Sequence, residues 1–132
     1  MKYLLDTNIC IYIIKQKPEK VFKKFGNYSV GQIGISSITY SELYYGASKS
    51  QRTVQNEAAL SQFTAPLEIM PFSEDVAATY GTIRASLEKA GNPIGPLDTL
   101  IASHAAHLGL TLVTNNTKEF SKVPKLKMEN WT

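Results

Sequence analysis

Three acidic residues stand where the predicted strands and helices of this chain meet. Asp6 directly follows an apolar run at the start of the chain. Glu42 lies in the first turn of a predicted helix over 39–48, and Asp98 in the first turn of another over 96–108. In a parallel α/β sheet the helices begin at the edge where the strands end, and such folds bind their ligands there. We therefore expect the three carboxylates to converge at one edge of a sheet.

Carboxylates that converge in a cleft repel one another, and a bound divalent cation relieves that repulsion. The expected donors are all oxygen atoms, with no cysteine or histidine partner, which favours Mg²⁺ or Mn²⁺ over Zn²⁺. The pattern predicts a Mg²⁺ or Mn²⁺ site.

Each of these acids also has a purely structural explanation. Thr39 and Glu42 fit the spacing of a capping box, and Asp98 complements the dipole of its helix. Asp6 could cap a helix predicted over 8–15. Any one acid alone is better explained as a cap, whereas three at one edge favour a metal site.

The two histidines do not supply an obvious catalytic base. His104 shares the apolar face of its predicted helix, which indicates a packed core histidine. His107 is expected near the surface. No nucleophile–histidine arrangement and no phosphate-binding glycine loop can be recognised in the sequence.

Strands alternate with helices along the chain, which predicts an α/β fold with a mostly parallel central sheet of four to five strands flanked by helices. Residues 1–132 are expected to form one domain. The predicted strands are 2–5, 32–36, 67–70, 110–114 and a short one near 126–128. The predicted helices are 8–15, 18–25, 39–48, 52–64, a long helix opened by Pro71 and Ser73, and 96–108.

Composition fits an ordinary globular domain, with 132 residues of which 43% are hydrophobic. The single cysteine, Cys10, is expected to be buried, and the cytosol is the default location. Neither a signal peptide nor a membrane span is expected. The net charge is +3, with lysines grouped over 15–24 and 118–127, which permits a polyanionic partner.

Four segments in order resemble the motifs of PIN-domain proteins, and most closely those of the VapC toxins of bacterial type II toxin–antitoxin pairs. They are Leu4 to Asn8, Ser36 to Gly46, Pro93 to Ala102 and Leu112 to Phe120, and the ending Met128 to Trp131 also fits. The likeness covers the whole chain with the spacing of the family.

This resemblance implies a PIN-like fold and Mg²⁺- or Mn²⁺-dependent endonucleolytic cleavage of RNA. It also implies a VapB-type antitoxin as partner and a homodimer. The paired asparagines and the Glu-Phe pair resemble the group that cleaves initiator tRNA in its anticodon stem-loop, which would inhibit translation. The apolar helix 8–15 is a candidate for the dimer contact or for part of the antitoxin groove.

Asp6, Glu42 and Asp98 match the first three acids of the family, and we expect Asp6 and Asp98 to bind the metal directly. Many PIN proteins have an aspartate where this chain has Asn116, so either Asn116 or Glu119 completes the site. Supporting polar roles, such as orienting the phosphate or metal-bound waters, are expected for Asn8, Thr114, Asn115 and Asn116.

Two alternatives remain at this point. The chain could be an α/β domain that binds RNA or a protein partner without cutting, or a PIN-like nuclease that acts on DNA. Fold alone does not choose among them.

Overall fold

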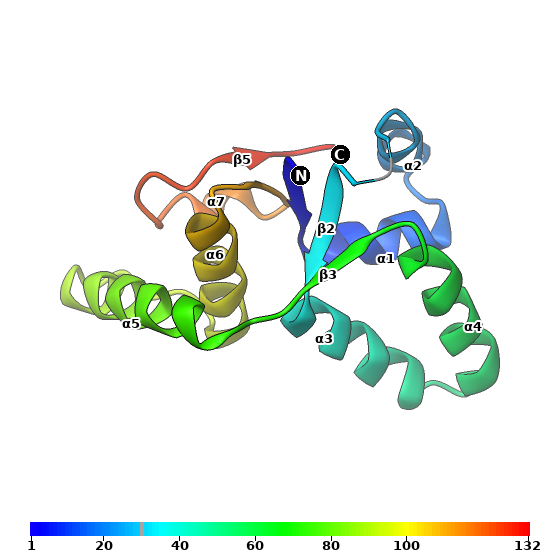
Figure 1. Ribbon diagram of the computed structural model, residues 1–132, viewed down its shortest axis with the longest axis horizontal. Helices are drawn as coiled ribbons and strands as arrows, with labels where there is room; N and C mark the ends of the chain where they lie inside the picture. Colours follow the sequence, from blue (N-terminus) through cyan, green and yellow to red (C-terminus); the bar gives the residue numbers. More distant parts are fainter. Residues whose placement is uncertain (30) are drawn as a thin grey trace.

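A five-stranded parallel sheet forms the centre of the computed structural model, which describes residues 1–29 and 31–132 (Figure 1). The strand order is β3-β2-β1-β4-β5, and all four neighbouring pairs are parallel. The strands are β1 (Tyr3–Leu5), β2 (Ile33–Ser36), β3 (Glu68–Met70), β4 (Thr111–Val113) and β5 (Met128–Glu129). The prediction of a mostly parallel α/β sheet is confirmed.

Helices cover both faces of this sheet in the described residues (Figure 1). They are α1 (Thr7–Lys15), α2 (Glu19–Gly26), α3 (Ser37–Ser48), α4 (Thr53–Thr64), α5 (Glu74–Lys89), α6 (Pro96–Leu108) and α7 (Thr117–Phe120). Parallel strands require crossover connections, and the helices between them supply these. None of the described helices combines the length and the apolar character needed to cross a membrane.

The alternation of side chains along β1 divides the core into two layers. Tyr3 and Leu5 point to the side where α1 to α4 pack, and Leu4 points to the side of α5, α6 and α7. All three side chains are buried, as expected for a central parallel strand. Helices therefore pack against both faces of the sheet, and this packing positions the residues at the edge where the strands end.

Several element boundaries differ from those predicted. Helix α3 begins at Ser37, two residues earlier than expected, because the Ser36 hydroxyl accepts a hydrogen bond from the Ile38 N–H and acts as the N-cap. The last strand lies at Met128–Glu129, slightly beyond the expected 126–128. Helix α7 was not predicted, since four residues are too short for a helical period to be visible.

Candidate active site

Asp6 is buried at the end of β1, with 5% of its surface exposed. Its Oδ1 accepts a hydrogen bond from the Thr7 N–H at 2.8 Å, so it is indeed the N-cap of α1. Its Oδ2 accepts from the Thr114 hydroxyl, also at 2.8 Å. Burial raises the pKa of Asp6, while these two donors act in the opposite direction. A cap alone does not need this second bond, which joins β1 to the end of β4.

Asp98 lies in the first turn of α6, behind an N-cap at Gly95 and a proline at the helix start. Burial raises the pKa of Asp98, and the charges of Asp6 and Glu119 raise it further. The carboxylates of Asp6, which follows β1, and of Glu119, on α7, therefore both act electrostatically on Asp98. We call Asp6, Asp98 and Glu119 the site acids.

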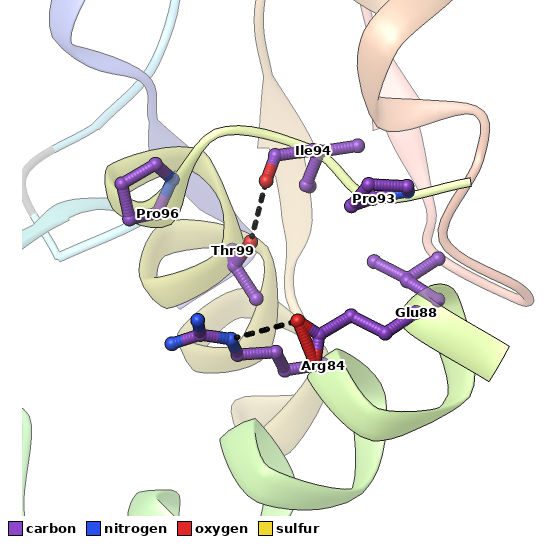
Figure 2. Close-up of a pocket in the computed structure, with 7 residues that line it drawn as sticks. Arg84, Glu88, Pro93, Ile94, Pro96 and Thr99 are labelled. Atoms are coloured by element: carbon purple, nitrogen blue, oxygen red, sulfur yellow. Dashed lines mark hydrogen bonds and ion pairs between the residues drawn. The ribbon is translucent and has the colours of Figure 1, made fainter. Parts of the chain in front are cut away.

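Figure 2 shows how the loop 93–95 is attached to the first turns of α6. The buried Thr99 hydroxyl donates to the carbonyl of Gly95 at 2.8 Å and approaches that of Ile94 at 3.5 Å. These bonds hold the start of the helix that carries Asp98. Behind this loop lies a cavity of about 170 Å³ that no site acid lines; it is formed by Arg84, Leu87, Glu88, Pro93, Ile94, Pro96 and Thr99.

Glu119 reaches the site from α7, a helix that sequence reasoning missed. Its Oε2 pairs with the Lys122 ammonium at 3.2 Å. The side chain of Asn116, the alternative fourth ligand, is exposed at the N-terminus of α7 and makes no capping hydrogen bond. The charge of Glu119 acts on Asp98, which supports Glu119 as a site residue, and whether Glu119 or Asn116 completes the site stays a prediction.

Glu42 lies in the second turn of α3, because the helix begins earlier than predicted. The capping-box explanation for Glu42 is therefore wrong, since Ser36 caps the helix and Thr39 is buried without a hydrogen-bond partner for its hydroxyl. Glu42 is half-buried at the wall of a groove beside Lys15. Its charge is not among the causes that raise the pKa of Asp6 or Asp98.

Of the expected supporting residues, Thr114 and Asn115 make side-chain hydrogen bonds to other residues, whereas Asn8 is exposed. The Thr114 hydroxyl is fully buried, donates to Asp6 and accepts from the Asn116 N–H at 3.0 Å. It therefore orients a carboxylate, while the expected role of Thr114 toward the phosphate or metal-bound water stays a prediction. Asn115 donates to the Tyr12 hydroxyl at 2.9 Å. Asn8 is exposed on the first turn of α1.

Tyr12 and Lys122 are the residues near this site whose roles sequence reasoning missed. Tyr12 looked like one more apolar residue of α1, and its partner Asn115 lies 103 positions later, so no local signal was available. The spacing of Glu119 and Lys122 is that of neighbours on a helix, and it would have been informative had α7 been predicted.

Both histidines lie where they were expected. His104 is fully buried, and its Nδ1 is 2.8 Å from the Ser36 hydroxyl. Burial lowers the pKa of His104. His107 is exposed and contacts the hydroxyl of Thr79 and the carboxylate of Asp75. Neither histidine contacts a site acid, so neither is placed to act as their base.

The donor set fits a hard divalent cation that retains part of its water shell. Within residues 1–29 and 31–132, no three acidic, histidine or cysteine side chains stand together at full metal-ligand spacing. Mg²⁺ is commonly held by one or two carboxylates and several waters, so a closed cage is unnecessary. Two carboxyl groups with raised pKa, next to a third acid, form a site that a cation would stabilise.

Residues 3–126 match the family model described as the PIN domain, so the chain belongs to the PIN-domain family. PIN-domain nucleases generally depend on a divalent metal, in agreement with the donor set. Relatives that match this chain over its full length are VapC proteins, so the chain belongs to the VapC group of the PIN-domain family.

The chain is 45% identical, over 132 residues, to the tRNA(fMet)-specific endonuclease VapC of Shigella flexneri, covering 100% of this chain and 99% of that protein. It is 44% identical to the protein of the same name from Salmonella typhimurium, covering 99% of this chain and 98% of that one. A crystal structure of DNA-bound VapBC from Salmonella typhimurium superposes with a TM-score of 0.94, at 43% identity and with 100% and 99% of the two chains covered.

Proposed function

We propose that this protein is the toxin of a type II toxin–antitoxin pair and cleaves RNA endonucleolytically with Mg²⁺, which Mn²⁺ could replace. The observation that carries the proposal is that Asp98 feels the charges of both Asp6 and Glu119, although the three acids come from separate parts of the chain. Ribonuclease names among the full-length relatives support the same activity.

Each site residue has a distinct role in this proposal. Asp6 and Asp98 would bind the metal directly, and the metal would supply positive charge to the phosphate and activate a water molecule. Thr114 holds the Asp6 carboxylate in place through its hydroxyl. Glu119 completes the acidic set, and Glu42 would act through water or at a second metal. Asn8, Asn115 and Asn116 would contact the RNA backbone or the metal's waters.

Initiator tRNA is the substrate we propose, cut in its anticodon stem-loop so that translation is inhibited. Support comes from two relatives, each named as a tRNA(fMet)-specific endonuclease, at 45% and 44% identity. Lysines over 15–24 and from Lys118 onwards would contact phosphates, and this binding should weaken with salt. The exposed Tyr44 and Tyr45 could stack unpaired loop bases.

The test of the activity uses purified, antitoxin-free protein and bulk tRNA with Mg²⁺, with Mn²⁺ or with a chelator. We expect discrete fragments that require metal and disappear in Asp6→Ala and Asp98→Ala, both of which should remain folded. Ribosomal RNA and DNA serve as competing substrates. Cleavage that persists in either variant would contradict the site, preferred cleavage of DNA would favour the DNA-nuclease alternative, and no cleavage at all would favour a binding domain.

A VapB antitoxin is the proposed partner, as in the VapBC complexes solved for similar proteins. An apolar groove of about 290 Å³ between α1, α3 and α4 is suited to a helix or tail of that antitoxin. Its lining includes Ile11, Ile14, Leu43 and Ala59. Helix α1 lines this groove, and its part in antitoxin binding or in a dimer contact remains a prediction, as do homodimerisation and cytosolic location.

Ala58 and Ala59 provide a matched pair for testing this groove. They are neighbours on α4, but Ala59 lines the groove and Ala58 is exposed outside it. We expect Ala59→Arg to weaken binding of the antitoxin encoded beside this protein by at least about tenfold, because it buries a charge in an apolar contact. Ala58→Arg should bind normally, and equal binding by both variants would rule out this groove.

A further inference from the structure

Glu119 differs from the other two site acids in having a cationic partner. Among the ion pairs of the described residues, only the one between Lys122 Nζ and Glu119 Oε2, at 3.2 Å, includes a site acid. Asp6 is instead held by neutral donors, the Thr7 N–H and the Thr114 hydroxyl. The chain itself therefore places one positive charge beside the site acids.

This ion pair can exchange partners easily. The side chains of Lys122 and Glu119 are 32% and 30% exposed, so both remain in contact with water. A pair this accessible is weak, and the long lysine stem lets its ammonium group move by several ångströms without moving the helix. A divalent cation carries twice the charge of the ammonium and would compete with it for the Glu119 oxygens.

We propose that Lys122 is an exchangeable counter-ion: it neutralises Glu119 while the site is free of metal, and it binds a phosphate of the RNA once the metal has taken over that carboxylate. This inference rests on the proposed metal-dependent cleavage of RNA at the same site. Lys122 has donors only, so after losing the carboxylate its natural partner beside the site is a backbone phosphate.

Loss of the Lys122 charge should have opposite effects on the affinity for metal and on the affinity for RNA. Removing the Lys122 charge removes a competitor of the metal and a source of repulsion, so metal affinity should rise. The same change removes a phosphate contact, so RNA binding should weaken. A lysine that merely holds α7 in place would instead weaken both when removed, because Glu119 would become less well ordered.

The experiment compares Lys122→Met, just beyond the end of α7, with Lys118→Met, which removes the same charge from an exposed position within α7. Mn²⁺ is titrated into each metal-free protein by calorimetry, without RNA. We expect Lys122→Met to bind Mn²⁺ about two- to tenfold more tightly than the wild type, and Lys118→Met to change by less than about twofold. Lys122→Gln, which keeps a polar side chain, should behave like Lys122→Met.

The KM for tRNA at saturating Mg²⁺ gives the second measurement. We expect Lys122→Met to raise it by about threefold or more at low salt, with a slope against log salt that is shallower by about 0.7 to 0.9. Unchanged or weaker Mn²⁺ binding in Lys122→Met, or an unchanged KM, would overturn the proposal. Absence of Mn²⁺ binding by the wild type, or equal binding by Asp98→Asn, would instead contradict the metal site on which the proposed function rests.

Discussion

The hydrogen bond between Thr114 and Asp6 is open to a sharp test, because replacing the threonine by valine removes the hydroxyl and nearly preserves the shape. Thr114 is fully buried and Asp6 is 5% exposed, so water cannot easily replace the lost donor. A buried hydrogen bond to a charged group contributes about 1.5 to 3 kcal/mol. Because the Asn116 N–H also loses its acceptor, we expect Thr114→Val to lose about 2 to 3 kcal/mol of stability.

The stability lost in Thr114→Val should depend on pH in a defined direction. The Thr114 hydroxyl favours the ionised form of Asp6 and so lowers its pKa relative to what burial alone would set. Its contribution is therefore present where Asp6 is ionised, and it disappears as the pH falls through the pKa of Asp6 in the folded protein. The deficit of Thr114→Val should be largest near pH 8 and smaller in acid.

Thermal unfolding of the metal-free protein provides the assay, with Thr114→Ser as the control that keeps the hydroxyl. For a chain of this size, about 2 to 3 kcal/mol corresponds to a fall of roughly 6 to 12 °C in the unfolding midpoint. Thr114→Ser should lose only the packing of one methyl group, about 1 kcal/mol, at every pH. If the valine and serine variants were equally stable, or if the valine deficit did not change with pH, the role assigned to Thr114 would be wrong.

Two further predictions concern titratable groups. Asp98 has a raised pKa, so the protein without metal loses stability as the pH rises through that pKa. Asp98→Asn should therefore unfold at a higher temperature than the wild type at neutral pH, and this difference should vanish in acid and be reversed by Mg²⁺. The cleavage rate of Asp98→Asn should fall at least about 100-fold. His104 has a lowered pKa, so the unfolded chain takes up the proton first as the pH drops below about 6.5 and the wild type loses stability there. His104→Gln should lack this loss in urea unfolding at two pH values, whereas the surface variant His107→Gln should retain it.

The amino-acid sequence by itself determined the order of strands and helices, because each of these elements is marked by a pattern of neighbouring residues. Apolar runs marked the strands, and spacing of apolar residues marked the long helices. An acid directly after β1 and another in the first turn of α6 had to lie at the edge where the strands end, whatever the details of packing. The order of the motifs supplied the family, and the comparison with known proteins confirmed it.

Only the tertiary structure decided which side chains meet at that edge. Leu5 pairs with Val113, and this register of β1 against β4 brings Asp6 next to Thr114, a residue 108 positions away. The position of Glu119, whose charge acts on Asp98, likewise depends on α7, which is too short to leave a periodic signal. Contacts of this kind follow from packing both faces of the sheet at once, and the register that results is a property of the whole fold rather than of any local segment.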